Sequence, residues 1–174
     1  VLAMADALAH RGPDSGGAWS DRSSGLAMAH RRLSILDLSE AGHQPMLSHC
    51  QRYVLSFNGE IYNHIELRRE LEINGYIASF NGWVGQSDTE TLLAGIEFWG
   101  LAQTLEKASG MFALALWDRK EKTLFLCRDR MGEKPLYYGF SRNIFLFSSE
   151  LKAIKKYPTF ASELDPIAVQ QYLT

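Results

Sequence analysis

The strongest constraint on the fold is an apolar run at residues 111–117, Met-Phe-Ala-Leu-Ala-Leu-Trp. Apolar side chains occupy both alternating sets of positions, so a strand formed here must be covered on both of its faces. Three further β-rich segments, residues 123–127, 136–140 and 144–147, follow at close spacing and are joined by short polar turns. This spacing predicts antiparallel strands in meanders.

Amphipathic helices are predicted on either side of these strands. Residues 1–9 carry an apolar stripe, and residues 150–157 return to a helical pattern. Asn63 with Glu66, and Ser87 with Glu90, have the spacing of capping boxes, which predicts helix starts there. Together the pattern favours an α+β fold, a four-layer α/β/β/α sandwich of antiparallel sheets.

Other segments are predicted from turn signals and β-forming residues. Residues 10–17 are rich in turn formers and are predicted as a loop, whereas residues 26–30 and 76–80 are predicted as short strands. A strand over residues 53–57 is expected to stop at Asn58-Gly59, since Asn-Gly is the strongest short-range turn signal.

Composition excludes several classes of protein. The 174 residues have a net charge of −2 without a basic stripe, which argues against a nucleic-acid binder. The apolar runs are too short to span a bilayer, which argues against a membrane protein. Cys50 and Cys127 are too few for a disulfide scaffold and are expected to be reduced thiols in a cytoplasmic protein. His43, His49 and Cys50 fit no standard zinc spacing.

The ends of the sequence suggest one domain taken from a longer protein. Residues 1–157 are predicted to form that domain, and its true start is expected to lie before residue 1 because the first helix begins without a capping residue. Residues 158–174 are predicted as a linker and a helix that starts at Asp165-Pro166, an N-cap followed by proline at the first helical position.

Asn58, Gly59 and Glu60 form the most informative candidate site. An asparagine amide and the N–H of the neighbouring glycine can together hold the oxyanion of an acyl-transfer intermediate. Glu60 could accept from an ammonium group. An ordinary hairpin turn explains the same tripeptide without any function and is the more common case.

Arg32 and Asp88 add opposite charges to this candidate site. A guanidinium can capture a carboxylate with two hydrogen bonds, although Arg31 beside Arg32 leaves the individual assignment open. Asp88 lies in the first turn of a predicted helix, where it either binds an amine or only complements the helix dipole. A free amino acid with a side-chain carbonyl would be complementary to the combined set.

An ordered series of motifs carries a resemblance to a known family. In chain order the motifs lie at residues 10–14, 30–35, 44–46, 57–63, 87–90, 110–113, 128–130 and 134–138. The series closely resembles the glutaminase domain of glutamine-hydrolysing asparagine synthases, which are class II amidotransferases of the N-terminal-nucleophile type.

The resemblance implies a role for each matching position. Arg32 would hold the glutamine α-carboxylate, and Asn58 and Gly59 would form the oxyanion hole. Glu60 and Asp88 would anchor the α-ammonium group, and the pocket wall would be formed by Leu33, Ser34, Ile35 and Leu36. The family's nucleophile is an N-terminal cysteine whose own α-amine is the base.

The resemblance also implies partners beyond these residues. Glutamine would be the substrate, and a C-terminal synthetase domain in cis would use ATP and magnesium to convert aspartate to asparagine with the ammonia. No cofactor or metal is expected within the 174 residues, and no nucleic acid or membrane partner. A homodimer remains an open alternative.

Two departures from the family pattern matter. The sequence has no N-terminal cysteine, and the family's first strands, which precede the opening helix, are missing. Neither Cys50 nor Cys127 stands where the nucleophile belongs, so residues 1–174 alone are predicted to be inactive. The alternatives are a related amidotransferase with another acceptor, a non-catalytic scaffold that has lost its cysteine, and a structural β-sandwich with incidental motifs.

Overall fold

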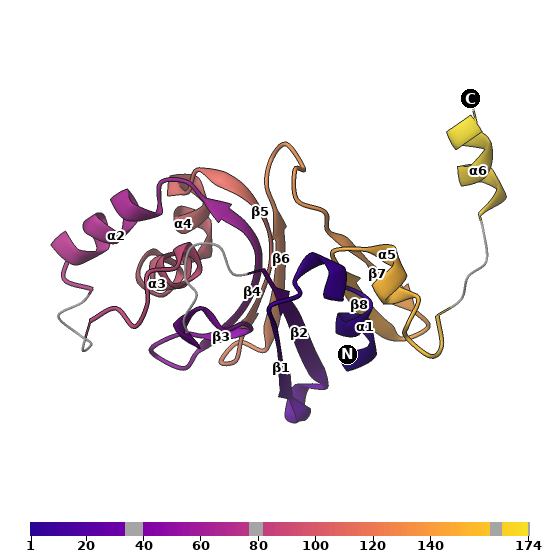
Figure 1. Ribbon diagram of the computed structural model, residues 1–174, viewed down its shortest axis with the longest axis horizontal. Coiled ribbons are helices and arrows are strands. Elements are labelled where there is room, and N and C mark those ends of the chain that lie inside the picture. The colour runs from indigo at the N-terminus through magenta and orange to yellow at the C-terminus, as the bar shows by residue number, and fades with distance from the viewer. Residues whose placement is uncertain (34–39, 77–81, 161–164, 174) are drawn as a thin grey trace.

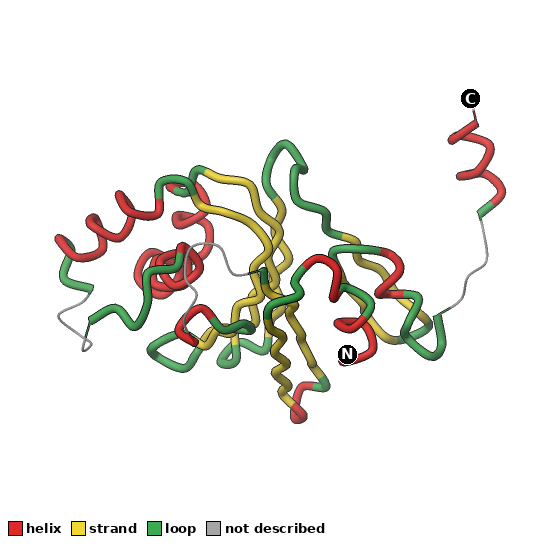
Figure 2. The backbone as a smooth tube through the Cα atoms, in the orientation of Figure 1, coloured by secondary structure: helices red, strands yellow, loops and turns green. Residues whose placement is uncertain are grey.

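Four layers build the molecule, in the order helices, sheet, sheet, helices (Figures 1 and 2). The computed structural model describes residues 1–33, 40–76, 82–160 and 165–173. All strand pairs in these ranges are antiparallel, so the predicted α+β class and the sandwich are confirmed. In the described residues, no helix is long and apolar enough to cross a membrane.

The central sheet has the strand order β3-β4-β5-β6. Its strands are β3 (Met46–Leu47), β4 (Tyr53–Ile61), β5 (Gly110–Asp118) and β6 (Thr123–Arg128). Strand β5 is buried on both faces, as its apolar run predicts: Leu114 packs in the core toward the helices, while Ala115 and Trp117 pack toward the second sheet.

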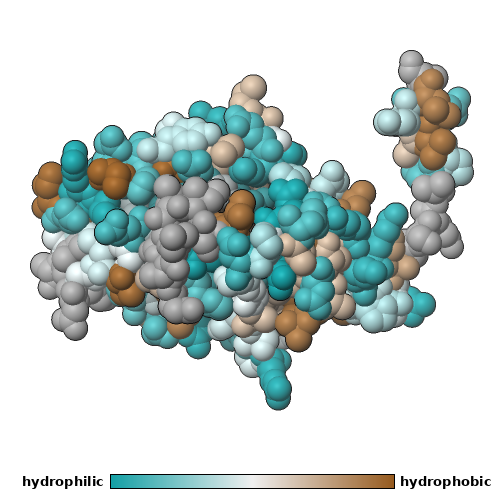
Figure 3. All heavy atoms as spheres, viewed as in Figure 1, coloured by the Kyte–Doolittle hydropathy of each residue, from teal (hydrophilic) through white to brown (hydrophobic). Residues whose placement is uncertain are grey.

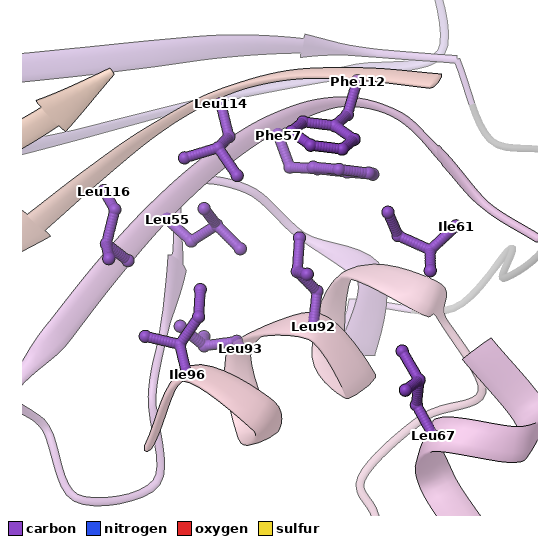
Figure 4. Close-up of a cluster of buried hydrophobic side chains, with 10 residues drawn as sticks. All are labelled: Leu55, Phe57, Ile61, Leu67, Leu92, Leu93, Ile96, Phe112, Leu114 and Leu116. Carbon is purple, nitrogen blue, oxygen red and sulfur yellow. The ribbon is translucent and has the colours of Figure 1, made fainter. Parts of the chain in front are cut away.

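One face of the central sheet is covered by α2 (His64–Ile73), α3 (Asp88–Trp99) and α4 (Leu101–Lys107) (Figure 1). Leu92, Leu93 and Ile96 of α3 point at the apolar side chains of β4 and β5 (Figure 4). The predicted start of α3 is confirmed, because the Ser87 hydroxyl accepts the Glu90 N–H at 3.1 Å.

The second sheet layer consists of two hairpins. Strands β1 (Ser15–Asp21) and β2 (Leu26–Arg32) form one, and β7 (Tyr137–Ser141) and β8 (Ile144–Ser148) form the other. Met28 of β2 packs against Val54 and Trp117, which closes the sheet-on-sheet core. The outer helices are α1 (Leu2–Asp6) and α5 (Leu151–Ile154), which contact each other and these hairpins.

The predicted C-terminal helix is present as α6 (Pro166–Leu173). The Asp165 carboxylate accepts the Ile167 N–H at 2.9 Å, as expected for an N-cap. Its apolar side chains are exposed, including Ile167 and Leu173, and they form a brown patch on the visible face (Figure 3).

The structure corrects the predicted turn at Asn58-Gly59. Strand β4 runs straight through both residues, because Asn58, Gly59 and Glu60 pair with Ala113, Phe112 and Met111 of β5. Tertiary pairing here overrides the local turn signal. A glycine also suits the strand, since a Cβ at position 59 would lie 2.3 Å from the Met111 carbonyl oxygen.

Two other predictions are wrong, and a third lies largely outside the described residues. Strand β1 occupies part of the predicted loop at residues 10–17, where the turn formers Gly16 and Gly17 lie within the hairpin. Asn63 does not cap α2, because its side chain instead bonds to the backbone of Lys107 and Ser109. Helix α4 was not expected, and most of the predicted strand at residues 76–80 lies outside the described residues.

We predict that Leu92→Ala lowers the free energy of unfolding by about 2–5 kcal/mol, because this fully buried side chain would leave a cavity between α3 and the sheet. Urea denaturation measures the change. The matched control is Ile73→Ala at a side chain that is 85% exposed, where a change within about 0.5 kcal/mol is expected. Equal effects of the two variants would contradict the assigned core.

Candidate active site

The site is built on the edge of β4 that faces away from β5. Residues two apart in a strand present their backbone N–H groups on the same edge. On this edge the Phe57 N–H donates to Gln44 Oε1 at 2.6 Å, and the Ile61 N–H donates to Asp88 Oδ2 at 2.9 Å. The Gly59 N–H lies between these two on the same edge.

The Gly59 N–H is an uncommitted donor. Its cross-strand neighbour Phe112 uses both of its backbone groups on the other side, with Asp129, so Gly59 and Phe112 form a non-hydrogen-bonded pair. No partner for this N–H occurs among the described residues.

The Asn58 side chain supplies a second donor. Its Nδ2 is buried and has no hydrogen-bond partner within the part of the chain that the structure describes. A buried donor without a partner carries a desolvation cost of about 1–3 kcal/mol, so it points to a ligand that the group is placed to meet. Neighbouring donors of this kind suit a developing oxyanion.

Both donors lie at a cavity of about 260 Å³ that contains charges of both signs. All the described residues predicted for the site line this cavity, namely Arg32, Leu33, Asn58, Gly59, Glu60 and Asp88. Ser34, Ile35 and Leu36 lie outside the described residues. The sequence-based prediction therefore selected residues that the fold brings together from β2, β4 and α3.

Asp88 ties the helical layer to the edge of β4. It is the first residue of α3 and is only 6% exposed. Besides Ile61, its carboxylate accepts the backbone N–H of Thr89 at 2.8 Å. Burial raises the pKa of Asp88 above its usual range, and the two backbone hydrogen bonds oppose that rise. The carboxylate keeps further acceptor positions for a ligand amine, since each oxygen has two lone pairs.

Arg68 and Glu90 fix the loop from which Asp88 emerges. Arg68 donates to the carbonyl oxygens of Gly85 and Ser87 at 3.0 and 3.2 Å, and its guanidinium lies 4.1 Å from the centre of the Trp83 ring. Glu90 accepts the N–H groups of Val84 and Gly85, so it does not complete the predicted capping box. The Arg68–Glu90 ion pair joins these contacts, so the two side chains together hold the backbone of residues 84–87 in place.

Arg32 is placed by a close approach to a glycine. A Cβ at Gly42 would lie 2.0 Å from Arg32 Nη2, so the guanidinium lies directly against the Gly42 backbone. Arg31 also lines the cavity, and its buried Nε has no partner within the described ranges. The choice between the two arginines therefore stays open on geometry, although Arg32 is the one packed beside Gly42.

Several lining residues were not predicted as site residues: Arg11, His30, Arg31, Gly42, Gln44, Phe57, Ser87, Thr89 and Lys134. Most of them lie within the ordered motifs, but no local pattern assigns them a role. Arg11 is held by Glu150, whose Oε1 is 3.0 Å from Arg11 Nη1. Such contacts join segments more than a hundred residues apart and leave no periodic signal.

A second, larger cavity of about 760 Å³ meets the first at Asn58, His30, Arg31 and Arg11. It lies between β2 and β8, and its lining is largely apolar, with Met28, Leu146 and Phe147 among its residues. Among the strands of the described ranges, β2 pairs only with β1 and β8 only with β7. Each therefore has a free edge on this groove.

The two cysteines lie away from the site. Cys50 is exposed beyond β3, where its N–H donates to Glu97 at 2.8 Å, and Cys127 is half-buried in β6. Burial raises the pKa of the Cys127 thiol. Neither lines the small cavity. Within the described residues, no group of three or more His, Cys, Asp or Glu side chains could hold a metal ion.

Comparison with solved structures identifies the class of the fold. The chain superposes on glutamine phosphoribosylpyrophosphate amidotransferase from Bacillus subtilis with a TM-score of 0.68, at 21% identity, over 87% of this chain and 39% of that one. A second match, the allosteric regulatory enzyme of purine biosynthesis, has a TM-score of 0.57. The chain therefore shares the fold of these two enzymes.

The sequence matches the glutamine amidotransferase domain family over residues 1–174, and the chain belongs to that family. It is 42% identical to glutamine-hydrolysing asparagine synthetase 1 of Bacillus subtilis over all of this chain and 26% of that protein. It is 36% identical to amidase chry2 of Gibberella zeae over 85% of this chain and 21% of that protein. The chain thus spans about a quarter of the length of these curated relatives.

His30 makes the stability of the folded protein depend on pH. Its ring lies 3.4 Å from the Ser56 hydroxyl, and burial, together with Arg32 and His43, lowers its pKa to about 4. The folded state therefore keeps His30 neutral where the unfolded chain, with a pKa near 6.5, already binds a proton. Stability is retained above about pH 6.5 and falls as the pH drops toward 4.

We predict that the difference in unfolding free energy between the wild type and His30→Gln changes by up to about 3 kcal/mol between pH 7 and pH 4, with the wild type losing more. The comparison cancels the titration of carboxylates that both proteins share. Urea denaturation at several pH values measures it. A difference that does not vary with pH would show that His30 is not held neutral.

Proposed function

We propose that residues 1–157 bind glutamine and carry the pocket for its hydrolysis, as the ammonia-producing domain of an asparagine synthase. The observation that carries the proposal is the unpartnered, buried Asn58 Nδ2 beside the free Gly59 N–H, at a cavity with both positive and negative side chains. Membership in the glutamine amidotransferase domain family supports this choice of substrate.

The charges of the cavity suit the two ends of a free amino acid. Arg32 binds the α-carboxylate, for which a guanidinium offers two parallel hydrogen bonds. Glu60 and Asp88 accept from the α-ammonium group. The side-chain carbonyl oxygen of glutamine then lies toward Asn58 Nδ2 and the Gly59 N–H, which stabilise negative charge as it develops on that oxygen.

The nucleophile is an N-terminal cysteine that begins a strand preceding residue 1. We place this strand in the groove between β2 and β8, because two free strand edges and an apolar lining suit an added strand, and because the groove meets the glutamine cavity at Asn58. The N-terminal α-amine takes the thiol proton, since its pKa of about 7.7–8.0 lies near neutrality.

The reaction proceeds through two acyl transfers. The thiolate attacks the side-chain amide carbon, the tetrahedral oxyanion forms between Asn58 and Gly59, and the amine returns a proton as ammonia leaves. Water then attacks the thioester, releases glutamate and restores the thiol. Since Cys50 and Cys127 lie away from the cavity, residues 1–174 alone are expected to turn over no glutamine.

The acceptor chemistry belongs to the sequence that follows residues 158–174. Curated relatives at 42% and 37% identity are glutamine-hydrolysing asparagine synthetases about four times as long as this chain. A C-terminal synthetase domain in cis would therefore bind ATP, magnesium and aspartate, in a cytoplasmic protein. The fungal amidase relative keeps a different acceptor open as the second candidate.

We predict that Asn58→Ala lowers kcat for glutamine hydrolysis by about 10²–10³-fold, because one oxyanion donor is lost. The assay uses the natural protein with its own N-terminus and measures glutamate release. Thermal stability should stay the same or rise, because the donor has no partner among the described residues. Asn74→Ala, at the end of α2, is the matched control and should keep full activity. Unchanged kcat in Asn58→Ala would refute the proposed site.

The acceptor is tested with the same natural protein, glutamine, magnesium ATP and aspartate. Asparagine should form together with glutamate in a ratio near one, since each ammonia comes from one glutamine. Glutamate release without asparagine would assign the domain to an amidotransferase with another acceptor. A protein that binds glutamine but releases no glutamate would instead be the scaffold module that lacks a nucleophile.

A further inference from the structure

The segment before β3 reaches the small cavity through Gly42 and Gln44, and neither residue contributes a group to the proposed reaction. Strand β3 pairs with β4 at only two positions, Met46 with Leu55 and Leu47 with Val54. If this register continued, residue 44 would lie opposite Phe57 and residue 42 opposite Gly59. The β3–β4 hydrogen-bond ladder stops at Met46, and the geometry at Gln44 and Pro45 explains why it stops there.

The backbone leaves the sheet at Gln44. Its carbonyl oxygen turns toward β1, where it would lie 2.1 Å from a Cβ at Gly17. Pro45 has no N–H and cannot donate to a ladder. The main chain at Gln44 is therefore directed toward the β1–β2 hairpin rather than along the edge of β4.

The side chain of Gln44 takes the place of the missing strand partner. Its Oε1 accepts the Phe57 N–H at 2.6 Å in a buried hydrogen bond, and the residue is 7% exposed. A side-chain amide oxygen reproduces one rung of the ladder without bringing a second backbone alongside the next residues. The edge of β4 is thus held at Phe57 and left open beyond it.

The open edge is what keeps the Gly59 donor free. If the ladder continued in register, the backbone of residue 42 would face Gly59, take its N–H and fill the cavity. Instead Gly42 lines the cavity and lies against the Arg32 guanidinium. With Asp88 bonded to Ile61, the Gly59 N–H is the donor left between two fixed points.

We propose that Gln44 is a positioning residue for the oxyanion donors, which holds β4 at Phe57 through its side chain so that the Gly59 N–H and the Asn58 amide stay aligned and unoccupied. The proposal rests on the proposed function, because it assigns these donors to glutamine hydrolysis. Gln44 itself acts only through β4.

The test compares Gln44→Met with Gln44→Glu in the natural protein. Methionine fills a similar volume but offers no comparable acceptor, whereas a glutamate carboxylate can still accept the Phe57 N–H, as Asp88 does at Ile61. Gln44→Met should lower kcat for glutamine hydrolysis by at least tenfold with KM changed less than threefold. Gln44→Glu should stay within about threefold of the wild type in kcat. Gln103→Met, at an exposed position of α4, is the matched control and should match the wild type.

A second measurement does not depend on activity. Hydrogen exchange of the peptide that covers residues 54–61 should speed up in Gln44→Met and keep wild-type protection in Gln44→Glu. Equal kcat in the wild type and Gln44→Met, or equal losses in both Gln44 variants, would overturn the role of Gln44 and leave the proposed function standing. A wild-type protein that hydrolyses no glutamine would instead overturn the proposed function.

Discussion

The candidate site depends on how one edge of β4 distributes its backbone N–H groups. The opposite edge pairs with β5 along the whole strand and fixes β4 in the core. On the edge that faces away from β5, Leu55 pairs with β3, Phe57 bonds to a glutamine side chain and Ile61 bonds to a buried carboxylate. The N–H groups on this edge thus bond to a strand, a side-chain amide and a carboxylate in turn. No backbone of the described residues runs alongside Gly59 on this edge, so its N–H stays free although its neighbours on the edge have partners.

The core and the site share the same supports. Asp88 begins α3, so the packing of Leu92 and Ile96 against the sheet also sets where that carboxylate meets Ile61. Arg68 of α2 fixes the loop before Asp88 by donating to two of its carbonyl oxygens. A change in the helical layer therefore alters the β4 edge through defined hydrogen bonds, in keeping with the need for rigid support around a catalytic geometry.

What the sequence predicted, and what it did not, follows from the range of the interactions. The burial of β5 and the start of α3 at Ser87 are local patterns, and both were predicted correctly, although Glu90 does not complete the capping box. The turn predicted at Asn58-Gly59 was wrong, because pairing with β5 outweighs the local preference of that dipeptide, although both residues line the cavity. Gln44 and His30 gave no signal as site residues, since their roles arise from contacts with Phe57 and Ser56 on another strand.

The unpartnered Asn58 amide also bears on whether the pocket could be a relic. Burying that donor costs about 1–3 kcal/mol, a large share of the 5–15 kcal/mol by which domains are typically stable. A scaffold gains nothing from this cost, and an apolar side chain of similar shape would remove it. A pocket that binds a developing oxyanion recovers the cost in the transition state, where the donor finds its partner. The unpartnered donor therefore favours a working glutaminase pocket over a scaffold.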